Sequence, residues 1–291
     1  MNKSTPLKRP IYWILDWDGT ITQKDTLNAL VNIAASAKPD FPTQSRWQSV
    51  VDAYMSDYTS TLANLTTTGL PTTLTSEKKL LQHLKAAEQR SLDRVFASQI
   101  FTAITTQHLE QGARDALDSA QVCVRPGFVD FFHALASAPG STFHILSVNW
   151  SRQFIASCLS AAGISLPLSS IVANELDGMA QGPGRCPSTG EISPEGTVKI
   201  ISSGDKLCHL NAIREENKGS VVYVGDSWPD IECLVEADVG ICIRDEEMGS
   251  SQKKLAEALG RVGIGCDRLG DGDGVVWARD FVEIKRWAEG C

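Results

Sequence analysis

Residues 11–20 read IYWILDWDGT, an apolar run that ends in two aspartates and a glycine turn. The run has the length and composition of a buried strand, and Asp16 and Asp18 follow it directly. Side chains two residues apart leave a strand on the same face, so both carboxylates can address one reacting atom. One can attack while the other handles the proton of a leaving group. An Asp-Gly turn also occurs without chemistry, so the motif needs support from the rest of the chain.

Later apolar runs, at residues 142–146 and 220–224, also end in polar residues that can carry chemistry. Ser147 follows the first of these runs, and Asp226 and Asp230 follow the second. Between the two runs, Lys206 stands at the start of an amphipathic stretch. In chain order the motifs are Asp-x-Asp-Gly-Thr, serine, lysine and Gly-Asp-x-x-x-Asp. Each is weak alone, but the ordered set is specific.

This set resembles the haloacid dehalogenase (HAD) superfamily of aspartyl-phosphate phosphotransferases. The resemblance covers residues 11–21 and 125–245. It implies an α/β fold with a Rossmann-like parallel sheet and a phosphatase that forms an aspartyl-phosphate. Transport ATPases of the superfamily carry threonine at the position of Asp18, and the true dehalogenases lack the acid. Asp18 therefore favours a phosphatase or a phosphomutase.

Phosphoryl transfer needs an in-line nucleophile, a proton donor and positive charge around the phosphoryl oxygens. Asp16 is the predicted nucleophile, and Asp18 is the predicted acid and base. Lys206 is preferred over Lys199 as the source of positive charge because it opens a helix. The Ser147 hydroxyl and the backbone amides after it, which follow the apolar run 142–146, are expected to bind an anion at a helix N-terminus. The predicted phosphate-binding set is Thr20, Ser147, Val148, Asn149 and Lys206.

Carboxylates gathered around a phosphate dianion repel it and one another. They need a hard cation, and oxygen-only ligands suit Mg²⁺. The predicted ligands are Asp16, Asp18 through its backbone carbonyl, Asp226, and Asp230 directly or through water.

The spacing of apolar residues changes along the chain, and these changes indicate its helices, strands and domains. We predict four helices, at residues 26–37, 45–65, 76–101 and 105–120. Such an insertion resembles the C1 cap of phosphoserine-phosphatase-like members, which closes over the site and excludes water. The predicted domains are therefore a catalytic core at 1–21 and 123–291 and a helical cap at 22–122.

Strand–helix alternation in the second part of the chain predicts a parallel sheet with ligands at the carboxyl ends of its strands. The turn-rich segment 177–194 is predicted to be a loop or hairpin, and the tail adds a strand at 275–278 and a helix at 281–288. Further strands are predicted near 142–146, 171–173, 220–224 and 239–243, and further helices near 128–138, 151–162, 207–216 and 230–236.

Some residues depart from the phosphoserine phosphatase pattern. Pro229 stands where an asparagine is usual, and Val148 follows Ser147 where a glycine pair is usual. These differences point away from phosphoserine as the substrate. Asp25 occupies the position of an acid that reads a substrate amine, but it can equally cap the helix that begins near Thr26.

Three tryptophans lie within three residues of predicted catalytic side chains. Trp17 alternates away from the two aspartates and is expected in the core. Trp150 and Trp228 can line a pocket for an apolar or aromatic leaving group, or they can brace the cap.

Composition agrees with a small-molecule enzyme in the cytoplasm. The 291 residues carry a net charge of −8, which argues against nucleic-acid and anionic membrane partners. The eight cysteines are scattered and read as reduced thiols. The predicted partner is a small phosphorylated metabolite, and the oligomeric state is open. Alternatives are an isoprenoid or aromatic phosphate or diphosphate as substrate, a phosphomutase, and a non-catalytic binding protein.

Overall fold

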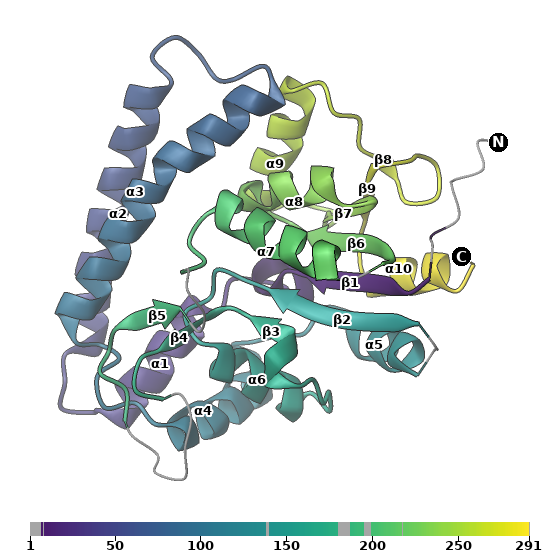
Figure 1. Ribbon diagram of the computed structural model, residues 1–291. Helices are drawn as coiled ribbons and strands as arrows, with labels where there is room; N and C mark the ends of the chain where they lie inside the picture. Colours follow the sequence, from purple (N-terminus) through teal and green to yellow (C-terminus); the bar gives the residue numbers. More distant parts are fainter. Residues whose placement is uncertain are drawn as a thin grey trace.

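The computed structural model describes residues 7, 9–137, 140–179, 187–194, 199–216 and 218–290. Within them, a parallel sheet of seven strands has the order β3-β2-β1-β6-β7-β9-β8 (Figure 1). The α/β fold with a parallel sheet is therefore confirmed. The strands of this sheet are β1 (Ile11–Leu15), β2 (Ser141–Leu146), β3 (Ile171–Val172), β6 (Ser220–Gly225), β7 (Val239–Ile243), β8 (Asp267–Arg268) and β9 (Val275–Ala278).

The central strand β1 pairs with β2 on one side and β6 on the other. Its last residue, Leu15, lies opposite Ile145 and Val224, so the three strands end at the same edge of the sheet. All residues of β1 and β6 are buried, as expected for strands covered on both faces. The order of strands reverses direction around β1, which is where open α/β sheets bind ligands.

Helices cover both faces of the sheet, and β1 contributes alternate residues to each. Trp13 belongs to the core cluster with Phe131 and Phe281, whereas Ile14 belongs to the cluster with Leu210. The core helices are α5 (Phe128–Ala136), α6 (Arg152–Ala161), α7 (Ser203–Glu216), α8 (Ile231–Glu236), α9 (Ser250–Arg261) and α10 (Phe281–Ala288).

The predicted helices between β1 and β2 are present as α1 (Leu27–Ala37), α2 (Thr43–Leu65), α3 (Leu74–Ser98) and α4 (Thr106–Asp118). Helices α2 and α3 pack along each other as a long hairpin beside the sheet (Figure 1). Helices α1 and α4 pack together, and α4 also packs on the core helix α6. Helix α3 of this hairpin also packs on the core helix α7. The domain boundaries remain predictions.

Other elements differ from the sequence expectations. Helix α7 begins at Ser203 rather than near residue 207, and α9 and β8 were not expected. Strands β4 (Asn174–Leu176) and β5 (Ile192–Pro194) pair as an antiparallel hairpin, while residues 180–186 of the predicted loop lie outside the described residues. None of the helices described combines the length and apolar character needed to cross a membrane. The described cysteines are free thiols, and Cys186 and Cys291 lie outside the described residues.

Candidate active site

The structure brings the predicted motifs together at the carboxyl edge of the sheet. Asp16 follows β1, Ser147 follows β2, and Asp226 follows β6. Lys206 reaches the same place from the first turn of α7. Four segments that are far apart in the sequence therefore meet where three neighbouring parallel strands end.

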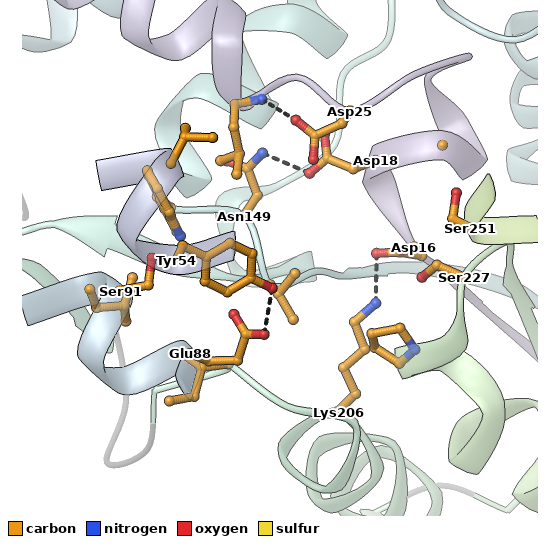
Figure 2. Close-up of a pocket in the computed structure, with 18 of the residues that line it drawn as sticks. Asp16, Asp18, Asp25, Tyr54, Glu88, Ser91, Asn149, Lys206, Ser227 and Ser251 are labelled. Carbon is orange, nitrogen blue, oxygen red and sulfur yellow. Dashed lines mark hydrogen bonds and ion pairs between the residues drawn. The ribbon is translucent and has the colours of Figure 1, made fainter. Parts of the chain in front are cut away.

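Asp16 and Lys206 form a buried ion pair. Asp16 Oδ1 lies 2.8 Å from Lys206 Nζ, and the two residues are 4% and 1% exposed (Figure 2). The same ammonium lies 2.7 Å from Asp230 Oδ1. Burial lowers the pKa of Lys206, but the charges of Asp16 and Asp230 outweigh burial and raise it overall. Lys206 therefore stays charged beside the predicted nucleophile, and Lys199 instead pairs with Glu191 at 3.6 Å.

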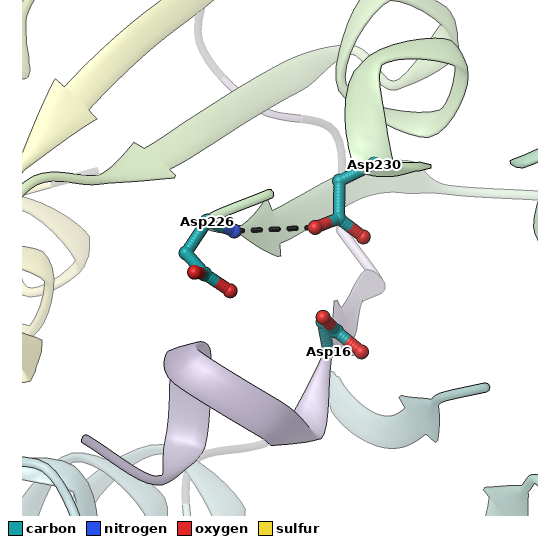
Figure 3. Close-up of side chains that lie close together, drawn as sticks. All are labelled: Asp16, Asp226 and Asp230. Atoms are coloured by element: carbon teal, nitrogen blue, oxygen red, sulfur yellow. Dashed lines mark hydrogen bonds between the residues drawn. The ribbon is translucent and has the colours of Figure 1, made fainter. Parts of the chain in front are cut away.

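Asp16, Asp226 and Asp230 form a compact carboxylate cluster, with one oxygen of each within 4.8 Å of the others (Figure 3). Burial and then the charge of Asp230 raise the pKa of Asp16 well above its ordinary value, and the same causes raise the pKa of Asp226 to about 7. Gly19 allows this close approach: its φ is +75°, and a Cβ there would lie 2.4 Å from Asp226 Oδ2. Buried, mutually repelling oxygen ligands are the donor set that a hard divalent cation requires, so the residues present fit Mg²⁺.

Asp230 is held by several donors in addition to Lys206. Its Oδ1 accepts a hydrogen bond from the Tyr223 hydroxyl at 2.6 Å. Its Oδ2 accepts bonds from the Ser227 amide at 3.0 Å, the Ser227 hydroxyl at 2.8 Å and the Asp226 amide at 3.3 Å. Burial raises the pKa of Asp230, but Lys206 and these hydrogen bonds outweigh it and lower the pKa overall. Asp230 is thus an ionised carboxylate that fixes both Lys206 and the turn after β6.

Asp18 is positioned by residues on two other segments. Its Oδ1 accepts bonds from the Thr26 amide at 2.7 Å and the Thr26 hydroxyl at 2.6 Å, and its Oδ2 accepts one from Asn149 Nδ2 at 2.9 Å. The buried Trp17 indole donates to the Thr26 hydroxyl at 3.1 Å, so this core tryptophan helps to fix the hydroxyl that binds Asp18. Burial raises the pKa of Asp18, although the bonds from Thr26 and Asn149 partly offset it. Asp18 is therefore oriented, and its raised pKa favours holding a proton.

The remaining predicted phosphate-binding residues have different surroundings. The Thr20 hydroxyl is buried and donates to Asp226 Oδ1 at 3.1 Å, so it orients that carboxylate. The Ser147 hydroxyl is also buried and accepts a bond from the Asn149 amide at 3.1 Å. Val148 and Asn149 line the cavity described below. In this structure Thr20 orients Asp226 and Ser147 binds the Asn149 amide, and the predicted contact of both hydroxyls with phosphate stays a prediction.

Asp25 binds the backbone at the start of α1, and its other predicted role, as the acid that reads a substrate amine, stays a prediction. Its carboxylate accepts a bond from the Leu27 amide at 2.8 Å at the start of α1, and it also lines the cavity beside Asp18 (Figure 2). Burial by the surrounding groups and then the charge of Asp18 raise the pKa of Asp25 to about 6, although the residue itself is exposed to solvent.

Arg125 is a site residue that sequence reasoning missed. It is 3% exposed, its Nε donates to the Thr20 carbonyl at 2.9 Å, and one of its terminal nitrogens donates to the Gly19 carbonyl at 2.7 Å. Its other terminal nitrogen pairs with Asp245, beyond the end of β7. Arg125 thus ties the turn after β1 to the neighbouring end of the sheet. The one available signal was an arginine directly before Pro126, where strand–helix alternation resumes.

A cavity of about 380 Å³ lies between the core and the cap. The core side carries Asp16, Asp18, Lys206 and Asp226, and the cap side is formed by α2 and α3. The cap helices contribute a mainly apolar wall, with Trp47, Val50, Val51, Tyr54, Glu88, Ser91 and Leu92. A cavity of this size matches the lower part of the range for small-molecule sites, about 300–1,000 Å³.

Trp150 and Trp228 have separate roles. Trp150 lines the cavity and makes edge-to-face contacts with Trp47 and Phe101. Trp228 instead donates its indole N–H to Glu77 of α3 at 2.6 Å and is 4% exposed. Trp150 therefore both lines the pocket and braces it, whereas Trp228 joins the core to the cap in an adjoining cavity.

No family model matches the chain. A CTO1 family protein of Schizosaccharomyces pombe is 30% identical over 244 residues, covering 81% of this chain and 82% of that protein. Cold tolerance protein 1 of Saccharomyces cerevisiae is 25% identical over 282 residues, covering 88% of this chain and 85% of that protein.

Solved structures share the fold over most of the chain. A phosphoserine phosphatase, in a structure of a phospho-aspartyl intermediate analogue, is 15% identical with a TM-score of 0.53, covering 97% of this chain and 99% of that one. A HAD family hydrolase of Salmonella enterica serovar Typhi is 13% identical with a TM-score of 0.51, covering 86% of this chain and 67% of that one. The fold is therefore that of the HAD superfamily and resembles that of phosphoserine phosphatase, as the motifs predict.

Proposed function

This chain belongs to the CTO1 family, and from that premise and its HAD fold we propose that it is a Mg²⁺-dependent phosphatase of a small phosphorylated metabolite. The observation that carries the proposal is the buried Asp16, which lies 2.8 Å from the Lys206 ammonium at the carboxyl edge of the sheet. A carboxylate held next to a fixed positive charge and open to a cavity has what a phosphoryl acceptor needs.

In the proposed reaction, two aspartates divide the chemical steps. The Asp16 carboxylate attacks phosphorus, the bond from phosphorus to the leaving oxygen breaks, and Asp18 gives its proton to that oxygen. Asp18 then takes a proton from a water that attacks the phosphorus of the aspartyl-phosphate. The bond between Asp16 and phosphorus breaks, and inorganic phosphate leaves with the Asp16 carboxylate restored.

The surrounding residues suit these steps. Burial raises the pKa of Asp18, which helps it to hold the proton that the leaving oxygen needs, and Thr26 and Asn149 keep it in one orientation. Lys206 presents a fixed charge to the phosphoryl oxygens and is itself held by Asp230. The backbone after Ser147, which leads into α6, supports an anion-binding role for the amide of Val148, whereas the Asn149 amide donates to the Ser147 hydroxyl in this structure.

Asp16, the backbone carbonyl of Asp18 and Asp226 would hold the cation. When bound, it neutralises charge on the phosphoryl oxygens and relieves the repulsion within the carboxylate cluster. Asp230 is occupied by Lys206, Tyr223 and Ser227, so we assign it to positioning.

The test is phosphate release from a panel of phosphomonoesters with Mg²⁺, for the wild type and for two pairs of variants. Asp16→Asn should abolish turnover while Asp130→Asn, on α5, should not. Lys206→Met should reduce it strongly while Lys199→Met, outside the cavity, should not. Turnover by Asp16→Asn at the wild-type rate would contradict the proposal.

A phosphomutase uses the same core and stays open as an alternative. The same panel separates the two activities, because a mutase converts a phosphate ester to its isomer without accumulating free phosphate. Product analysis by ³¹P NMR on each ester that reacts reads both outcomes directly.

A further inference from the structure

The cap side of the active-site cavity contains an acidic group that the proposed chemistry does not use. Within the described part of the chain, Glu88 is the carboxylate that α2 and α3 contribute to this cavity. Figure 2 shows Glu88 and Tyr54 entering from the cap, with Asp16 and Lys206 on the core side. Glu88 is thus placed where the leaving group of a bound phosphate ester would lie.

Glu88 is oriented rather than free to rotate. The Tyr54 hydroxyl donates to Glu88 Oε1 at 2.8 Å. Burial and then the nearby Glu88 raise the pKa of Tyr54, so the phenol stays neutral and remains a donor. Burial raises the pKa of Glu88, with the Tyr54 hydrogen bond and the charge of Lys254 partly offsetting it. A carboxylate that is partly desolvated and held by one neutral donor gains from a positively charged or proton-donating partner.

Lys254, whose charge acts on Glu88, is engaged elsewhere. Lys254 of α9 lies 4.3 Å above the Trp228 ring, 4.7 Å above the Tyr58 ring, and donates to the Tyr58 hydroxyl. It lines the adjoining cavity, to which Glu88 and Tyr54 also contribute, but not the active-site cavity. On the side of the active-site cavity, the other charged groups are the catalytic carboxylates, Asp25 and Lys206.

Apart from Glu88, the cap side of the active-site cavity is mainly apolar. Val50, Leu92 and Trp47 line the cap side, and Trp150 faces Trp47 edge to face with ring centroids 5.7 Å apart. Such a wall favours an aromatic or aliphatic body over a polar one, because it offers few hydrogen bonds to replace those lost from water. The cavity therefore combines an anion site at its core end, apolar walls, and a carboxylate at its cap end.

We propose that Glu88, oriented by Tyr54, selects the leaving group: the preferred phosphate ester has an apolar or aromatic body that carries an ammonium or other cationic group. This inference rests on the proposed phosphatase function and names the class of its substrate. A second anionic group on the leaving group would face Glu88, and the residues that the structure describes offer no free cation in this cavity to balance it, so diphosphates and carboxylated esters are disfavoured.

The test uses three phenyl phosphates that differ at the 4-position: 2-aminoethyl, propyl and 2-carboxyethyl. Wild-type kcat/KM should be highest for the amino ester and lowest for the carboxy ester. Glu88→Gln keeps the size and an oxygen that can accept the Tyr54 bond. It should lower kcat/KM for the amino ester roughly 10- to 100-fold, as expected for loss of a charged hydrogen-bond partner, and raise it for the carboxy ester. The propyl ester should change little.

Two further variants separate recognition from general damage. Tyr54→Phe removes the orienting donor and should reduce the preference for the amino ester by less than Glu88→Gln does. Glu215→Gln, exposed on α7, removes the same charge far from the cavity lining and should leave all three values unchanged. Equal losses on the three esters in Glu88→Gln, or a wild type that does not prefer the amino ester, would overturn the inference.

Binding to the Asp16→Asn variant distinguishes this inference from the proposed function. Calorimetry with Mg²⁺ should show tighter binding of the amino ester, and adding Glu88→Gln should remove the difference. If the wild type binds with this preference but hydrolyses none of the esters, the proposed phosphatase function fails and the role of Glu88 stands. Binding without preference overturns the role of Glu88, whether or not the esters are hydrolysed.

Discussion

Replacing Glu77 by alanine should destabilise the protein and loosen the turn that carries the active-site carboxylates. Glu77 is fully buried at the start of α3 and accepts bonds from the Trp228 indole at 2.6 Å and from Arg261 at 2.8 and 2.9 Å. Trp228 lies between Asp226 and Asp230 in sequence, so the cap is hydrogen-bonded directly to the turn that positions them. Arg261 also donates to the Pro71 carbonyl at 3.1 Å, which adds a second connection to the cap.

The size of the effect follows from what the substitution leaves behind. Removing one partner of a buried ion pair costs about 3–5 kcal/mol, because the other charge stays desolvated. The Arg261 side chain is 24% exposed and can recover part of its hydration, so we expect a loss of about 3 kcal/mol in the free energy of unfolding. Trp228→Phe removes a single donor and leaves Glu77 paired with Arg261. It should cost about 1–2 kcal/mol, plus any loss from poorer packing.

The measurement is urea unfolding followed by circular dichroism, with Glu289→Ala as the matched control. Glu289 lies 3.8 Å from Lys285, and its side chain is 54% exposed, so its loss should change the free energy of unfolding by about 1 kcal/mol at most. Glu77→Ala should also raise the Mg²⁺ concentration needed for half-maximal phosphate release. A Glu77→Ala protein that is as stable as the control would show that this buried contact does not hold the cap to the core.

Other perturbations have equally direct outcomes. EDTA should abolish phosphate release, Mg²⁺ should restore it and Ca²⁺ should inhibit it, since Ca²⁺ favours a higher coordination number; full activity in excess chelator would contradict the metal assignment. Asp18→Asn should lower kcat by about 10²–10⁴-fold, whereas Thr26→Val, which removes one donor to Asp18, should retain activity and move the corresponding limb of the pH–kcat profile to higher pH. Burial lowers the pKa of His144, so the unfolded chain binds a proton more readily and stability should fall as pH drops below about 6.5. His144→Gln should weaken that dependence in urea unfolding at pH 7.5 and 5.5, and an unchanged slope would mean that other groups cause it.

The sequence predicted those parts of the structure that depend on local pattern. The apolar runs gave the central strands, and the order of the motifs placed Asp16, Lys206 and Asp226 at one edge. The predicted start of helix α7 was several residues too late. Its first turn contains Asp205 and Lys206, two charged residues that are buried, and they interrupt the apolar periodicity on which the prediction depended. Helix α9 was not predicted because few of its residues are apolar. Its buried face is formed mainly by Leu255, Ala258 and Leu259, which stand among polar neighbours in the sequence.

The contacts that orient the site could not be read from the sequence in the same way. Arg125 reaches the carbonyls of Gly19 and Thr20 across more than a hundred residues of chain, and Glu77 reaches Trp228 across 151. Glu88 looks like any other polar residue of an amphipathic helix until α3 is packed over the core. Side-chain identity and spacing specify which groups are available, whereas the tertiary packing of the cap decides which of them meet.

The position of β1 in the middle of the sheet also has a consequence for how the protein forms during synthesis. Strand β1 is synthesised before the other strands of the sheet, and its neighbours begin at Ser141 and Ser220, so both of its edges stay unpaired until the helical insertion has been made, and one of them until β6 follows. Helices α1 to α4 are made in that interval and can form local contacts early, as helical hairpins do. A chain interrupted before Gly225 would leave the buried strand Ile11–Leu15 with an unsatisfied edge, and we expect such fragments to need chaperones or to aggregate.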